Sequence, residues 1–151
     1  QGAVVREGAD VTVVASSCLV YEARRAAGGL SSFGVDIEIV DPRSVRPLDT
    51  ETIVKSVKKT GRVVVADTDW VMCGFSAEIA AIVAENAFEH LKAPVRRLGL
   101  VDSPAPVSEP LEDVFYPTAN TIANACLAAV GRPEIEGMIL DGAGPEFLGP
   151  Y

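Results

Sequence analysis

The chain has 151 residues, a formal net charge of −8 and an apolar content of 48%. This length and this apolar fraction suffice for one domain with a sizeable core, and they exclude an intrinsically disordered chain. The acidic balance argues against nucleic acid or an anionic membrane as partner, because both need a basic surface. No apolar run is long enough to span a bilayer.

The first residue is Gln1 rather than methionine, so we interpret the chain as a fragment, a processed form or a trimmed version of a longer protein. Its three cysteines, Cys18, Cys73 and Cys126, are odd in number and widely spaced, and they form no CxxC pair. This usage fits a reducing compartment better than a disulfide-stapled secreted fold, and we expect a cytoplasmic protein.

The first half of the chain predicts two strands and two helices. Residues 1–10 are interpreted as a lead-in from a missing upstream domain, with a turn at Glu7-Gly8. A strand is predicted at Val11–Ala15, a helix over 19–33 and a second strand over 36–40. The next helix begins at 48–50, where Asp49 or Thr50 can cap it, and ends before Gly61.

The second half continues the alternation with a β-branched strand at 62–67, a polar and aromatic turn, and a long helix over 74–91. A fourth strand is predicted over 94–101, then a proline-rich loop over 102–110 and a last helix over 118–130. Strands and helices that alternate in this way predict an α/β fold, a three-layer α/β/α domain over 11–131 with a mostly parallel sheet. Residues 132–151 break the pattern and are interpreted as an extended C-terminal tail.

Five stretches of the chain, in order, resemble one family. They are VVREGADVTVVASS at 4–17, VDPRSVRPLDTETIVKSVKKTGRVVV at 40–65, WVMCGFSAEI at 70–79, AFEHLKAPVRRL at 87–98 and DSPAPVSEPLE at 102–112. They are similar to the C-terminal domain of the β subunit of thiamine-diphosphate-dependent 2-oxo acid dehydrogenases, the pyruvate and branched-chain decarboxylase components. More broadly, the chain resembles the transketolase C-terminal domain.

The resemblance implies a parent enzyme that decarboxylates a 2-oxo acid with thiamine diphosphate and magnesium, both bound by domains absent from this chain. It implies no catalytic, cofactor-binding or metal residue here, so the chain alone is expected to be inactive. The implied role is subunit association, with docking of the acyltransferase core as a further role. The implied partners are the upstream pyrimidine-binding domain, an α subunit and a second β subunit. Two alternatives stay open, a stand-alone docking module and the C-terminal domain of a transketolase-like sugar-phosphate enzyme.

Four residues, Arg43, Trp70, Met72 and Phe75, are the main candidates for an interface. Arg43 follows a predicted strand end, where a guanidinium can pair with a carboxylate across a subunit boundary; a solvated loop arginine is the alternative. Arg46 is a weaker candidate of the same kind. Trp70 and Met72 are bulky and apolar in a polar turn, as interface anchors often are, although a lid over the domain's own core is also open. Phe75 follows at the start of the helix.

The remaining polar residues favour structural roles. Cys73 precedes a helix start, which favours a thiolate, but no histidine lies near it in the sequence to act as a base. Glu78 is expected to stabilise the first turn of the same helix. Asp67 and Asp69 fit a solvated turn, with no third oxygen ligand for a metal. The only histidine, His90, falls at a helix C-terminus, where a cation is favoured.

Overall fold

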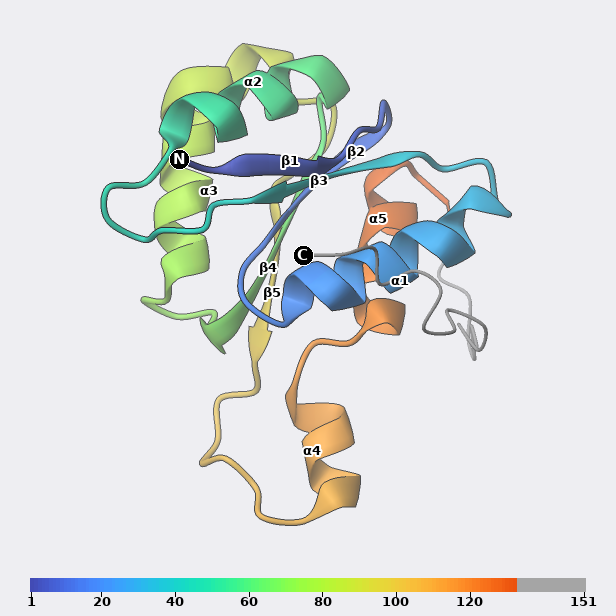
Figure 1. The fold of residues 1–151 in the computed structure, drawn as a ribbon, viewed down its shortest axis with the longest axis vertical. Helices are drawn as coiled ribbons and strands as arrows, with labels where there is room; N and C mark the ends of the chain where they lie inside the picture. The colour runs from blue at the N-terminus through green and yellow to red at the C-terminus, as the bar shows by residue number, and fades with distance from the viewer. Residues whose placement is uncertain (133–151) are drawn as a thin grey trace.

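The computed structural model describes residues 1–132 (Figure 1). Its elements, in chain order, are β1 (Ala3–Arg6), β2 (Val11–Ala15), α1 (Leu19–Ser31), β3 (Ile37–Asp41), α2 (Thr50–Thr60), β4 (Val63–Trp70), α3 (Phe75–Ala87), a 3₁₀ turn η1 (Phe88–His90), β5 (Arg96–Leu100), α4 (Glu109–Phe115) and α5 (Ala119–Ala129). Within these residues no helix is both long and apolar enough to cross a bilayer.

The strands form one five-stranded sheet in the order β1-β3-β2-β4-β5. β2 pairs in parallel with β3 and with β4, and β5 is parallel to β4. Only β1 is antiparallel, with Val4 opposite Val40 of β3. The central strands are buried on both faces, which explains why β2 and the first part of β4 are almost continuous runs of β-branched residues.

Helices cover both faces of the sheet, so the predicted three-layer α/β/α fold is confirmed (Figure 1). One core lies between the sheet and α1 with α5, and it contains Leu19, Leu30, Ile39 and Ile122. The other lies between the sheet and α2 with α3, around Ile53, Val57, Ile79 and Val83. A parallel sheet covered in this way places the loops that leave its carboxyl ends along one edge.

Local signals explain where α2 begins and ends. Asp49 is the N-cap, and its carboxylate accepts a hydrogen bond from the Thr52 backbone N at 3.1 Å. Gly61 ends the helix in the left-handed region, at φ 75°, where a side chain would be strained. Of the two capping residues that the sequence offered, the structure uses Asp49.

Four features differ from the sequence prediction. Residues 3–6 form the edge strand β1, and its ladder partner lies more than 30 residues away in sequence. The proline-rich stretch runs into a short helix, α4, because Pro110 lies in its first turn, where a missing N–H costs little. The helix predicted over 74–91 ends at Ala87 and continues as η1, and β4 extends to Trp70. The predicted tail, apart from Arg132, lies outside the described residues.

Candidate functional site

Three loops meet at the carboxyl ends of β2, β3 and β4 and line an open cavity of about 520 Å³. Its lining holds four hydroxyl groups, three carboxyl groups, one guanidinium and three apolar side chains. The lining residues are Ser16, Ser17, Asp41, Pro42, Arg43, Ser44, Val45, Asp67, Thr68, Asp69 and Phe75. This is the edge of an open α/β sheet at which ligand sites are usually built. We call it the strand-end cavity.

Asp67 is the most buried acidic residue of the strand-end cavity, with 5% of its surface exposed. Its Oδ1 accepts hydrogen bonds from Ser16 Oγ at 2.8 Å and from the Thr68 backbone N at 2.8 Å. Its Oδ2 is screened from solvent and has no hydrogen-bond partner among the described residues. The predicted solvated turn is therefore wrong for Asp67, because β4 continues past it and the Ser16 loop covers it.

Backbone strain is concentrated in the same loops. Within residues 1–132 the non-glycine residues with positive φ are Ser17 at 54°, Arg43 at 57° and Cys73 at 58°. Ser17 follows β2, Arg43 follows β3 and Cys73 follows β4. Such conformations persist only where the surroundings impose them, and they are frequent at binding sites.

Arg43 lies in the strand-end cavity but is largely exposed. Its backbone N donates to Asp41 Oδ1 at 2.8 Å, and its Nε lies 4.0 Å from Asp41 Oδ2. The guanidinium therefore pairs loosely with the carboxylate two residues before it. Arg46 is also exposed, further along the same loop.

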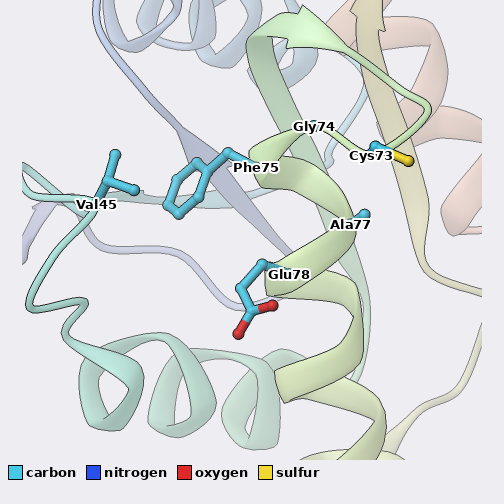
Figure 2. A pocket seen from close by; sticks show the side chains of 6 residues that line it. All are labelled: Val45, Cys73, Gly74, Phe75, Ala77 and Glu78. Atoms are coloured by element: carbon cyan, nitrogen blue, oxygen red, sulfur yellow. The ribbon is translucent and has the colours of Figure 1, made fainter.

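A second hollow of about 510 Å³ adjoins the first and shares Val45 and Phe75 with it. Figure 2 shows Phe75 pointing from the start of α3 toward Val45, whereas the side chain of Cys73 points the other way. Cys73 is exposed, and Glu78 is exposed in the first turn of α3. His90 lies in η1, beyond the far end of α3, so the structure does not bring a histidine to this thiol.

The four candidate interface residues fall into two pairs. Arg43 and Phe75 line the strand-end cavity. Trp70 and Met72 are not among its lining residues, and they are 51% and 77% exposed. Trp70 ends β4, opposite Leu100 of β5, instead of lying in a turn. It is not a closed lid over the core, since half of its surface is exposed, but whether it contacts a partner stays a prediction.

Sequence reasoning missed most of the lining of the strand-end cavity, namely Ser16, Ser17, Asp41, Pro42, Ser44, Val45 and Thr68. The signal that could have found them is topological, because polar residues directly after parallel strands share one edge of the sheet. Within residues 1–132 no three His, Cys, Asp or Glu side chains converge as a metal site.

A charged cluster lies toward the opposite end of β3. Glu38 is 2% exposed, and its Oε2 accepts hydrogen bonds from Lys59 Nζ and from the Gly8 backbone N. Lys59 also donates to Glu7 Oε2 at 2.7 Å. The hydrogen bond to Glu38, followed by that to Glu7, raises the pKa of Lys59, and the hydrogen bond from Lys59 lowers the pKa of Glu7. These groups tie β3 to the end of α2.

Comparisons with known proteins agree on one family. The profile described as "Transketolase, C-terminal domain" matches residues 1–122. The acetoin:2,6-dichlorophenolindophenol oxidoreductase subunit beta of Bacillus subtilis is 39% identical over 132 residues, 87% of this chain. The pyruvate dehydrogenase E1 component subunit beta of Rickettsia conorii is 40% identical over 125 residues, 83% of this chain.

A solved structure is also similar, that of a split-gene transketolase described as an inactive beta4 tetramer. It superposes with a TM-score of 0.78 at 30% identity and covers 87% of this chain. In each comparison the chain spans less than half of the other protein, 39% and 38% of the two relatives and 42% of the transketolase chain.

Proposed function

The chain belongs to the family of transketolase C-terminal domains, and we propose on this basis that it is the C-terminal assembly domain of a 2-oxo acid dehydrogenase β subunit. The parent enzyme would be a thiamine-diphosphate-dependent oxidoreductase that decarboxylates a 2-oxo acid. The identity near 40% to β subunits of pyruvate dehydrogenase supports the parent class. The chain would supply contacts between subunits, and the rest of the protein would supply the chemistry.

The observation that carries the assembly role is the exposure of three large apolar side chains near the carboxyl ends of β3 and β4. Val45, Trp70 and Met72 are 68%, 51% and 77% exposed. Val45 lies in the loop after β3, Trp70 ends β4 and Met72 follows it. Tryptophan is enriched among the residues that contribute most to binding at protein interfaces.

The lining of the strand-end cavity supports the proposal that thiamine diphosphate binds elsewhere in the complete protein. Three carboxyl groups, those of Asp41, Asp67 and Asp69, face one guanidinium in its lining. A diphosphate needs N–H donors or cations, such as a helix N-terminus with free N–H groups or an arginine clamp. An acidic lining repels it, so we assign cofactor binding to other parts of the complete protein.

The partners follow from the same proposal. The length of the relatives leaves room for an upstream pyrimidine-binding domain, and an α subunit and a second β subunit would complete the assembly. Docking of a basic acyltransferase-core segment is supported by the net charge of −8. A cytoplasmic location is supported by three free thiols, Cys18, Cys73 and Cys126.

Sedimentation equilibrium of the chain tests the assembly role. We expect concentration-dependent self-association that Trp70→Ala weakens about tenfold, about 1.4 kcal/mol. Phe88→Ala is the matched control, because Phe88 is also exposed, at 71%, but lies at the far end of α3. A strictly monomeric wild-type chain, or an equal effect of the two substitutions, would overturn the proposed interface.

A further inference from the structure

The strand β5 lies at one edge of the sheet, and its outer side is unpaired. β5 pairs only with β4, and no backbone hydrogen bond joins its outer side to any other part of the described chain. Its side chains are exposed or half-buried along its whole length. The other edge strand, β1, has four residues and an irregular register between Val4 and Arg6. Because an unpaired strand edge presents N–H and C=O groups to a further strand, β5 is the better candidate for pairing with another chain.

The sequence of β5 fits a second copy of itself in the antiparallel direction. In a register centred on Leu98, Arg96 of one copy lies opposite Leu100 of the other copy, and Arg97 lies opposite Gly99. Like charges directly opposite each other would destabilise such a pair, and this register avoids them. The register is also self-complementary, so a single two-fold axis at Leu98 generates both halves of the contact.

The charges on and after β5 favour the same arrangement. Arg96 is exposed and has no ion pair within the described residues. In the antiparallel register, Asp102 of one copy falls diagonally from Arg96 of the other copy, within reach of a long side chain. Residues 101–116 contain no lysine, arginine or histidine, and their acidic residues are Asp102, Glu109, Glu112 and Asp113. The segment that follows β5 is therefore complementary in charge to the amino end of β5 in a second copy.

The helix α4 within this acidic segment lacks packing partners in the described chain. It has seven residues, lies beyond the carboxyl ends of β4 and β5, and has at most marginal contact with any other helix or strand (Figure 1). Val107 is fully exposed and Leu111 is 57% exposed, whereas Phe115 at the end of α4 is buried. A helix this short gains most of its stability from tertiary packing. A second copy that runs antiparallel along β5 would bring its own strand edge beside this segment.

We propose that β5 is a self-association edge, at which two copies of this chain pair antiparallel around Leu98 and Arg96 of each copy contacts the acidic segment of the other. The inference rests on the proposed assembly function and adds the strand edge, the register and the partner of one contact. The edge is continuous with the candidate interface, because Trp70 at the end of β4 is opposite Leu100 of β5.

Exchange of the charges at positions 96 and 102 tests this register by sedimentation equilibrium of the chain. Arg96→Glu and Asp102→Arg should each weaken dimerisation about tenfold, because each creates two like-charge pairs in the symmetric contact. The double variant restores opposite charges and should dimerise within about threefold of wild type. Both residues are exposed, so the variants should fold. Lys58→Glu, at an exposed position of α2, is the matched control and should leave dimerisation unchanged.

The direction of the Asp102→Arg effect separates a specific contact from general charge repulsion. The net charge is −8, so the loss of a negative charge would strengthen association if only net repulsion acted. An unchanged or stronger dimer in Asp102→Arg, no recovery in the double variant, or an equal loss in Lys58→Glu would overturn the inference. Self-association that depends on Trp70 but not on these charges would overturn the edge contact alone and leave the assembly function in place. A strictly monomeric wild-type chain would overturn both.

Discussion

The buried carboxylate of Glu38 has one cationic hydrogen-bond donor, Lys59. It is 2% exposed, and its donors are Lys59 Nζ and the Gly8 backbone N at 3.3 Å. Lys59→Met leaves this buried charge underpartnered, so we expect the free energy of unfolding to fall by about 1–3 kcal/mol in urea titrations at neutral pH. Lys58→Met, at an exposed neighbour in α2, should change it by less than about 0.5 kcal/mol. Equal losses of unfolding free energy in Lys59→Met and Lys58→Met would contradict this role of Lys59.

The pH dependence of the Lys59 contribution follows from two pKa shifts. The pKa of Lys59 is raised above 10.5 by its hydrogen bond to Glu38, so its contribution is complete below pH 10.5 and is lost as the pH rises through the raised value. The pKa of Glu7 is lowered below 4.5 by the hydrogen bond from Lys59, so that contribution is present above pH 4.5 and lost as the pH falls through the lowered value. The difference in the free energy of unfolding between wild type and Lys59→Met should therefore stay constant between pH 4.5 and pH 10.5. It should shrink below and above this range.

Cys73 is exposed beside the strand-end cavity, and no histidine lies near it. We expect Cys73→Ser in the complete enzyme to change turnover by less than about tenfold, roughly 1.4 kcal/mol, because the proposed chemistry takes place elsewhere in the protein. Steady-state kinetics with the cofactor saturating is the measurement. A thousandfold loss in a folded enzyme with unchanged cofactor affinity would place the nucleophile in this domain.

The turn between β4 and α3 requires a glycine at position 74 for steric reasons. A Cβ on Gly74 would lie 1.9 Å from the Trp70 carbonyl oxygen, although its φ of −80° suits any residue. Gly74→Ala should therefore push α3 away from the end of β4 and lower the free energy of unfolding by about 1–3 kcal/mol.

Gly28→Ala is the matched control for Gly74→Ala. A Cβ on Gly28 meets nothing within 4 Å, and the residue lies inside α1. Alanine there should raise the free energy of unfolding by about 0.5–1 kcal/mol. Urea denaturation of the two variants should thus give shifts of opposite sign. A stable Gly74→Ala variant with an unchanged tryptophan fluorescence spectrum would show that this turn is looser than described.

The elements that the sequence predicted best are the central strands and helix α2. β2 and the first part of β4 are runs of β-branched residues, and α2 has an acidic cap and a terminal glycine, so local patterns suffice for them. β1 escaped prediction because it is a short edge strand whose pairing is nonlocal. α4 escaped because proline-rich sequence suggests a loop.

The candidate site was predictable only in part, because nonlocal strand pairing brings its residues together. The sequence indicated the stretch around Trp70 and Met72 as a candidate interface, because bulky apolar residues in a polar stretch are visible locally. The burial of Asp67 was not predictable, because the hydroxyl group that covers it belongs to Ser16, 51 residues away in the chain. Only the strand order of the sheet brings the two together.

For the molecule as a whole, the proposed division of labour predicts that the chain does not bind thiamine diphosphate. The acidic lining of the strand-end cavity disfavours a diphosphate, and the chain spans less than half of its relatives. Calorimetric titration with thiamine diphosphate and magnesium should give only the heat of dilution. A stoichiometric micromolar site would contradict the assignment of the cofactor to other domains.

The central claim is that this domain assembles the enzyme. The most direct measurement is sedimentation velocity of the complete protein carrying Trp70→Ala and Met72→Ala, beside wild type and Phe88→Ala. We predict that the double variant dissociates into smaller species at micromolar concentration while its far-ultraviolet circular dichroism stays that of the wild type, and that Phe88→Ala stays assembled. An intact assembly in the double variant, at the same concentration and with the same sedimentation coefficient as wild type, would contradict the account.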